Sequence, residues 1–266
     1  MNAHQLLLPA AACLALLAIS AAWCHAADAP AAKPAALPNL FFAMDTGLRD
    51  GKHTTPAQRA ETLAELGYVG SDLSGNKAVV ETLKAYDAKG VRLFDTYNYI
   101  DVKPDWTPDA DWKQAIKALK GRDAWLWVAM THKGLKCSDP AGDDDAVAAL
   151  RKLADLAAAD GVRVVIYPHT KSWVERLEDA VRLARKTGRD NVGATFNLCH
   201  FLQVDGDEAK LPGLLKESMD KLFVVTINGA DSGVKGWDKL IQPLGRGTFD
   251  VGGLLRTLNG LGFKGP

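Results

Sequence analysis

Short apolar runs alternate with longer amphipathic runs along most of the chain. The apolar runs carry hydrophobic residues at consecutive positions, as strands of a parallel sheet do when both faces are buried. Seven runs predict strands at residues 40–44, 68–73, 91–97, 124–130, 162–167, 192–198 and 222–227. A predicted helix follows each of them, and seven strand–helix units in succession indicate a parallel α/β fold.

Capping residues mark the ends of the predicted helices. Thr55, Pro56 and Gln58 are an N-cap, a first-turn proline and a capping-box glutamine. Ser172 and Glu175 predict a second capping box. The seven helices are expected at residues 56–66, 78–88, 111–119, 146–159, 173–186, 211–219 and 251–261.

The length of the region from residue 39 to residue 266 suits one β/α barrel, which typically needs about 250 residues. An open doubly wound sheet is the alternative, although no G-x-G-x-x-G follows the first strand to support its dinucleotide-binding form. We therefore predict a TIM-type (β/α) barrel of parallel strands that lacks the eighth strand and helix, because that strand should begin at residues 263–266. An open barrel would expose strand edges. We expect the sequence to be a fragment of a longer chain, or another segment to cover the gap.

Residues 1–38 differ from the barrel region in composition. Residues 6–23 are almost wholly apolar, small residues follow them, and no Lys, Arg, Asp or Glu precedes Asp28. This pattern predicts a secretory signal peptide at residues 1–26 and an Ala/Pro-rich linker at residues 27–38. We expect an exported protein, periplasmic or secreted, with no stable membrane span after cleavage. An uncleaved membrane anchor is the alternative.

The overall charge is balanced, with 32 basic and 32 acidic residues. A nucleic-acid partner usually shows as a basic patch or stripe, so none is expected. Only Cys137 and Cys199 lie beyond the signal peptide. Export permits a disulfide between them but does not establish one.

Three segments carry a resemblance to a known family. Residues 161–170, GVRVVIYPHT, look like the family's fifth strand, and residues 192–200, VGATFNLCH, like its sixth strand with an Asp-x-x-His motif. Residues 225–250 look like its His-x-Lys-Asp strand and the loop after it. The chain thus resembles a divergent member of the xylose isomerase-like barrel superfamily, the sugar phosphate isomerase/epimerase group. The resemblance implies a small carbohydrate substrate.

The resemblance also implies a divalent metal, Mn, Mg or Zn, held by Glu, Asp, His and Glu. The matching positions here are Tyr167, Asn197 and Asn228, and the fourth would lie on the missing strand. None of the three has the basic or anionic group that such cations prefer. We therefore assign no metal ligand and no confident cofactor, and a metal is allowed by the resemblance only.

Function in β/α barrels lies at the carboxyl ends of the strands. His200 matches the motif histidine that contacts sugar in the family, and His169 lies two residues after Tyr167, on the same side of an extended strand. Because imidazole exchanges protons near neutral pH, His200 and His169 are the predicted catalytic pair. The predicted substrate-binding residues are Tyr167, Asn197, Asn228, Asp231, Asp72, Tyr97 and Trp237. Asp72 could instead cap a helix or bind loop amides.

Three functions remain open on these residues. The first is an exported, carbohydrate-active isomerase or epimerase-like enzyme that moves a proton next to a sugar carbonyl. The second is a lyase or hydrolase that acts on keto-sugars, and the third is a non-catalytic sugar-binding barrel that has lost the family metal site. The fold alone cannot separate them, because function depends on the site. The sequence predicts neither which sugar is used nor the oligomeric state.

Overall fold

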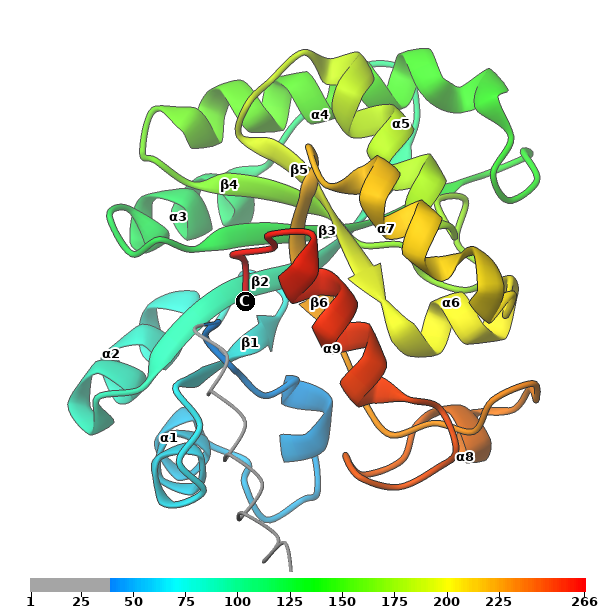
Figure 1. Cartoon of the computed structure of the whole chain (residues 1–266). Helices are drawn as coiled ribbons and strands as arrows, with labels where there is room; N and C mark the ends of the chain where they lie inside the picture. The colour runs from blue at the N-terminus through cyan, green and yellow to red at the C-terminus, as the bar shows by residue number, and fades with distance from the viewer. Residues whose placement is uncertain (1–38) are drawn as a thin grey trace, which may run out of the picture. The chain divides into compact units, whose positions relative to one another are not determined.

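Six parallel strands follow one another in sequence order around a common interior (Figure 1). The computed structural model describes residues 39–266, so the predicted signal peptide and linker lie outside the described residues. The strands are β1 (Gly70–Ser74), β2 (Arg92–Val102), β3 (Trp125–His132), β4 (Arg163–Ile166), β5 (Val192–Asn197) and β6 (Leu222–Thr226). Every neighbouring pair is parallel, which confirms the predicted barrel-type α/β fold.

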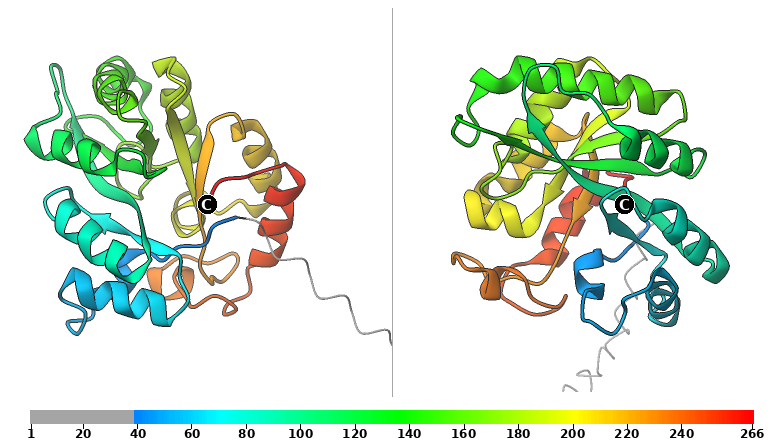
Figure 2. Two further views of the ribbon diagram at one scale, coloured as in Figure 1. Left: turned by 90° about the vertical axis from the view of Figure 1, so that its left-hand side faces the viewer. Right: turned by 180° about the vertical axis from the view of Figure 1, so that it is seen from behind.

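Helices cover the outer face of this curled sheet (Figure 2). The helices of the described residues are α1 (Pro56–Glu65), α2 (Val79–Lys89), α3 (Ala110–Leu119), α4 (Asp143–Ala158), α5 (Leu177–Thr187), α6 (Leu198–Val204), α7 (Leu211–Ser218), α8 (Trp237–Leu240) and α9 (Val251–Gly260). Three short 3-10 turns are η1 (Asp45–Leu48), η2 (Pro140–Gly142) and η3 (Glu208–Lys210). No helix within residues 39–266 has the length and apolar content to cross a bilayer.

Two apolar clusters account for the consecutive hydrophobic residues in the strands. The larger one fills the layer between sheet and helices, with Leu126 of β3 and Leu150 of α4 fully buried in it. The smaller one includes Trp125, Trp127 and Tyr167 and lies inside the curl of the sheet. Both faces of β3, β4 and β5 are therefore covered over most of their length, as the sequence pattern predicts.

The predicted capping boxes have different outcomes. The Thr55 box at the start of α1 is confirmed, with the Thr55 side chain accepting from the Gln58 N–H. The box at Ser172 and Glu175 is wrong, because α5 begins only at Leu177. The preceding residues are held in a loop by other hydrogen bonds, among them Val174 N–H to the Met130 carbonyl at 3.2 Å.

The first predicted strand is also corrected. Residues 40–44 make only an isolated bridge, from Ala43 to Ser71 of β1, before the chain turns into η1. At the opposite edge, the Val225 N–H of β6 donates to the Pro266 carbonyl at 3.1 Å. Asn39 Nδ2 donates to the Gly265 carbonyl at 2.6 Å, so the two segments that border the opening between β1 and β6 meet there. The described sheet is a curled, unclosed barrel of six strands.

Candidate functional site

The carboxyl ends of β4 and β5 bring Tyr167, His169, Asn197 and His200 together. Asn197 is the last residue of β5 and the N-cap of α6, where its Oδ1 accepts the His200 N–H at 3.3 Å. Its Nδ2 donates to the Tyr167 hydroxyl. Sequence reasoning missed α6, although asparagine is a preferred N-cap and could have indicated it.

The two predicted catalytic imidazoles lie against each other. Their ring centroids are 4.3 Å apart, with an angle of 47° between the planes. His200 is buried, whereas His169 is half-buried. The Tyr167 ring lies beneath both, at 5.9 Å from His200 and 6.4 Å from His169. The sequence-predicted pair therefore forms one cluster of contacting rings with Tyr167.

Thr170 is hydrogen-bonded to both imidazoles and was missed by sequence reasoning. Its backbone N–H donates to His200 Nδ1 at 3.3 Å, and its Oγ1 lies 2.9 Å from the same nitrogen. His169 Nδ1 lies 2.8 Å from the Thr170 carbonyl oxygen. Burial first, and then the charge on His169, lower the pKa of His200 to about 3. His200 is therefore a neutral imidazole at physiological pH.

Aromatic side chains flank the imidazole pair. The Tyr97 ring packs 5.1 Å from Tyr167, inside the barrel mouth. Tyr99 lies 6.4 Å from His169, and Trp237 of α8 lies 5.5 Å from His200. Tyr99 and Trp237 are 53% and 44% exposed, so their faces are open to solvent on the two sides of the pair. Tyr99 was missed because β2 extends five residues beyond its predicted end at residue 97.

Three predicted substrate-binding residues have protein partners of their own. Asp231 accepts the Thr248 N–H at 3.1 Å, and Asn228 Nδ2 donates to the Leu240 carbonyl at 2.6 Å. Asp72 is buried and accepts the Asp45 N–H. The structure does not place these three against the imidazole pair, and their contact with substrate stays a prediction.

Buried carboxyl groups lie across β1 and β2. Asp72 is paired in register with Asp95, and burial, followed by the charge on Asp45, raises the pKa of Asp72 to about 7. Asp95 is fully buried, and neither of its carboxyl oxygens has a hydrogen-bond partner among residues 39–266. Burial also raises the pKa of Asp95 well above its ordinary value. Both groups therefore favour the protonated form.

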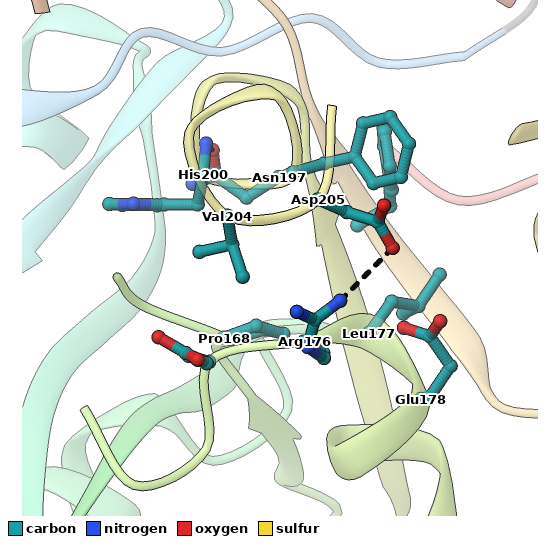
Figure 3. Close-up of a pocket in the computed structure, with 11 residues that line it drawn as sticks. Pro168, Arg176, Leu177, Glu178, Asn197, His200, Val204 and Asp205 are labelled. Carbon is teal, nitrogen blue, oxygen red and sulfur yellow. Dashed lines mark hydrogen bonds and ion pairs between the residues drawn. The ribbon is translucent and has the colours of Figure 1, made fainter. Parts of the chain in front are cut away.

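A small pocket touches one flank of the site (Figure 3). Its wall includes Asn197 and His200, together with the segment before α5 and the end of α6. Arg176 and Asp205 form a 3.0 Å ion pair beside it, and the His200 ring extends away from that pair (Figure 3). The pocket therefore lies beside the two imidazoles, and their rings do not point into it.

The family match extends over most of this fold. Residues 63–266 match the family model described as xylose isomerase-like TIM barrel. The chain belongs to this family. The structure and the family match together confirm the resemblance that the three sequence segments indicate.

One curated relative matches part of the sequence, and solved structures are similar in fold. The chain is 32% identical over 147 residues to 3-dehydroshikimate dehydratase from Pseudomonas aeruginosa, a match that covers 50% of this chain and 22% of the dehydratase. The chain thus spans about a fifth of that relative's length. Among solved structures, it is similar to 3-keto-D-glucoside 4-epimerase from E. coli, with TM-score 0.61, 17% identity, and coverage of 80% of this chain and 85% of that chain. It is also similar to D-allulose 3-epimerase from Methylomonas sp., with TM-score 0.60, 15% identity, and coverage of 80% and 78%.

A third neighbour, the IolI protein, was solved with a bound zinc atom. Its TM-score is 0.63 at 18% identity, covering 79% of this chain and 82% of that chain. The family resemblance therefore allows a divalent metal. Whether such an ion fits this chain depends on the side chains at the family's metal positions.

The residues at the family's metal positions do not fit such an ion. The Oδ1 and Nδ2 of Asn197 are both used in hydrogen bonds, to α6 and to Tyr167. Burial raises the pKa of the Tyr167 hydroxyl well above its usual range, so this group stays neutral. No cluster of three His, Cys, Asp or Glu side chains within residues 39–266 could hold a metal ion. Hard and borderline cations favour anionic oxygen or imidazole ligands, which this position lacks.

Proposed function

We propose that this protein is a sugar isomerase or epimerase-like enzyme that moves a proton next to the carbonyl group of a keto-sugar. The observation that carries the proposal is the imidazole pair, with ring centroids 4.3 Å apart at the carboxyl ends of the barrel strands. Catalytic groups of β/α barrels lie at this end. The proposed catalytic residues are His169 and His200.

The chemistry needs two kinds of group. A base must take the proton from the carbon beside the carbonyl, and a donor must stabilise the negative charge that develops on the carbonyl oxygen. His169 is half-buried and reaches solvent, as a proton-exchanging base requires. The low pKa of His200 keeps it neutral, and a neutral imidazole can donate its N–H to a developing enolate oxygen.

The surrounding residues suit a sugar. Tyr167 and Asn197 form a buried hydrogen bond beside the imidazoles, and the exposed rings of Tyr99 and Trp237 offer apolar faces on either side. Aromatic faces combine apolar contact with a fixed geometry, which suits the C–H face of a sugar ring. Two of the similar structures are named for epimerases of a glucoside and of allulose, which supports a carbohydrate substrate.

A keto-sugar fits this site better than an aldose or a simple hydroxy-sugar. The donor groups at the family's metal positions do not suit a cation that would polarise the substrate. In a keto-sugar the proton next to the existing carbonyl is already acidic. An imidazole base and a neutral N–H donor can then act on it directly.

Elimination of water is the second candidate. It begins with the same proton abstraction, and the relative of 32% identity is named as a dehydratase. The two reactions differ in their second step, because an isomerase returns the proton to the sugar and a dehydratase expels a hydroxyl group.

Product analysis tests the proposal. The purified protein is incubated with 3-keto-glucosides, D-allulose, D-fructose and 3-dehydroshikimate, and products are identified by NMR. We expect an isomer or epimer of a keto-sugar to form. The variants His169→Gln and His200→Gln should abolish this product. The control variant His53→Gln should retain it, because His53 lies outside the site. Formation of a dehydrated product would favour the lyase. Binding without any product would favour the sugar-binding barrel.

A further inference from the structure

A tight turn follows His169 and contains a strained residue. The Ser172 N–H donates to the His169 carbonyl at 2.9 Å, which closes a four-residue turn. Lys171, the third residue of this turn, has φ of 69°, in the left-handed region. That conformation is sterically costly for a residue with a Cβ atom and marks a type II turn, where glycine is usual. The Lys171 side chain is exposed, so packing of that side chain does not explain the strain.

The strained conformation controls the direction of one carbonyl group. A type II turn differs from a type I turn by reversal of the peptide between its second and third residues. In this turn that peptide carries the Thr170 carbonyl, which lies 2.8 Å from His169 Nδ1. The preceding peptide carries the Thr170 N–H, which donates to His200 Nδ1 at 3.3 Å. One residue thus presents an acceptor to one imidazole and a donor to the other.

These contacts require opposite tautomers. A carbonyl oxygen can only accept, so His169 must carry a proton on Nδ1, and its neutral ring then keeps a lone pair on Nε2. A backbone N–H can only donate, so His200 must keep a lone pair on Nδ1 and carry its proton on Nε2. The burial that keeps His200 neutral agrees with this assignment, since only the neutral ring has a nitrogen lone pair.

We propose that the turn from His169 to Ser172, held by the left-handed Lys171, sets the two imidazoles in opposite tautomers and so fixes their separate roles. His169 Nε2 takes the proton from the carbon next to the substrate carbonyl. The electron pair of that C–H bond forms the enolate C=C bond, and the carbonyl π pair moves to the oxygen. His200 Nε2–H donates a hydrogen bond to this oxygen. The proton held by His169 then passes to the former carbonyl carbon, and the proton of the hydroxyl group on the first carbon passes to the enolate oxygen, so the carbonyl group moves by one carbon. Lys171 is a positioning residue that acts through the backbone. This inference rests on the proposed function.

Three substitutions separate the turn from general effects on folding. Lys171→Val disfavours the left-handed conformation, because a β-branched residue is strongly strained there. Lys171→Gly is the conservative variant, because glycine adopts the same φ without strain. Asp105→Val is the matched control, since Asp105 is another exposed, left-handed residue, with φ of 61°, in the loop after β2.

The tautomers are measured by ¹⁵N NMR of the imidazole rings in the full chain, with His169→Gln and His200→Gln used for assignment. We expect His169 to be protonated on Nδ1 and His200 on Nε2 in the wild type, in Lys171→Gly and in Asp105→Val. Lys171→Val should lose the Nδ1 preference of His169. Its kcat should fall at least about 100-fold, the lower end of the range for a positioned acid or base, with KM little changed.

The two proposals fail in different ways. A wild-type His169 protonated on Nε2, or a Lys171→Val variant that keeps both tautomers, overturns the role of the turn. Altered tautomers with full kcat overturn the catalytic assignment. If no sugar is turned over, the proposed function fails, while the NMR still decides whether the turn sets the tautomers.

Discussion

Asp72 gives the protein a pH-dependent stability that can be predicted from the structure. Burial, followed by the charge on Asp45, raises its pKa from 3.8 to about 7. The folded state therefore holds this proton more tightly than the unfolded state does. The stabilisation is complete below pH 3.8 and is lost as the pH rises through 7. A difference of about 3 in pKa corresponds to roughly 4 kcal/mol.

Asp72→Asn removes this titration with little change of shape. The amide oxygen of Asn can still accept the Asp45 N–H that Asp72 accepts. At pH 4 the wild-type carboxyl is protonated and neutral, so the two proteins should have similar unfolding free energies. At pH 8 the variant should be the more stable one, by up to about 4 kcal/mol.

The comparison must be made between variants, because His200 acts in the opposite direction. Its pKa is lowered to about 3, so its contribution to stability is lost as the pH falls below 6.5. Urea unfolding of wild type and Asp72→Asn at several pH values between 4 and 8 cancels this common effect. Asp87→Asn is the control, because Asp87 is an exposed carboxylate that Arg122 holds at a lowered pKa. An unfolding free-energy difference between Asp72→Asn and wild type that stays constant from pH 4 to pH 8 would refute the reasoning.

Three further predictions concern the fold, the metal and the N-terminus. Gly70→Ala should destabilise the protein by about 3 kcal/mol in urea unfolding, since its Cβ would overlap the backbone carbonyl of Arg92, whereas Gly47→Ala, which has open space around it, should be tolerated. Elemental analysis of purified protein should find Mn, Mg and Zn well below one per chain, and stoichiometric metal would show that the donor-group argument is wrong. We also propose export on the pattern of residues 1–26, so N-terminal sequencing of the mature protein should begin at Ala27, and an intact Met1 would count against it.

Much of the fold could be predicted because its signals are local. Six of the apolar runs coincide with strands, and the Thr55 capping box marks the true start of α1. The capping box at Ser172 failed because the Val174 N–H donates to the Met130 carbonyl of β3, which helps to hold that segment in a loop. Residues 40–44 form only a bridge, since pairing at a sheet edge depends on partners that are distant in sequence.

The sequence predicted only some of the residues that meet at the candidate site. Parallel strands place their carboxyl ends together, and the family resemblance selected His200, so the sequence predicted that His169 and His200 face one pocket. The structure shows their ring centroids 4.3 Å apart. Their tautomers depend on the backbone of Thr170 and on a left-handed Lys171, a residue type with no preference for that conformation. The separate roles of the two imidazoles are therefore visible only in three dimensions.

Hydrogen exchange at the substrate carbon tests the central claim most directly. A keto-sugar that the protein binds is incubated with it in D₂O, and loss of the proton next to the carbonyl is followed by NMR. We predict that wild type and His53→Gln accelerate this exchange and that His169→Gln, with its half-buried imidazole removed, does not. Equal exchange by wild type and His169→Gln, or no exchange above the protein-free rate, would contradict the account.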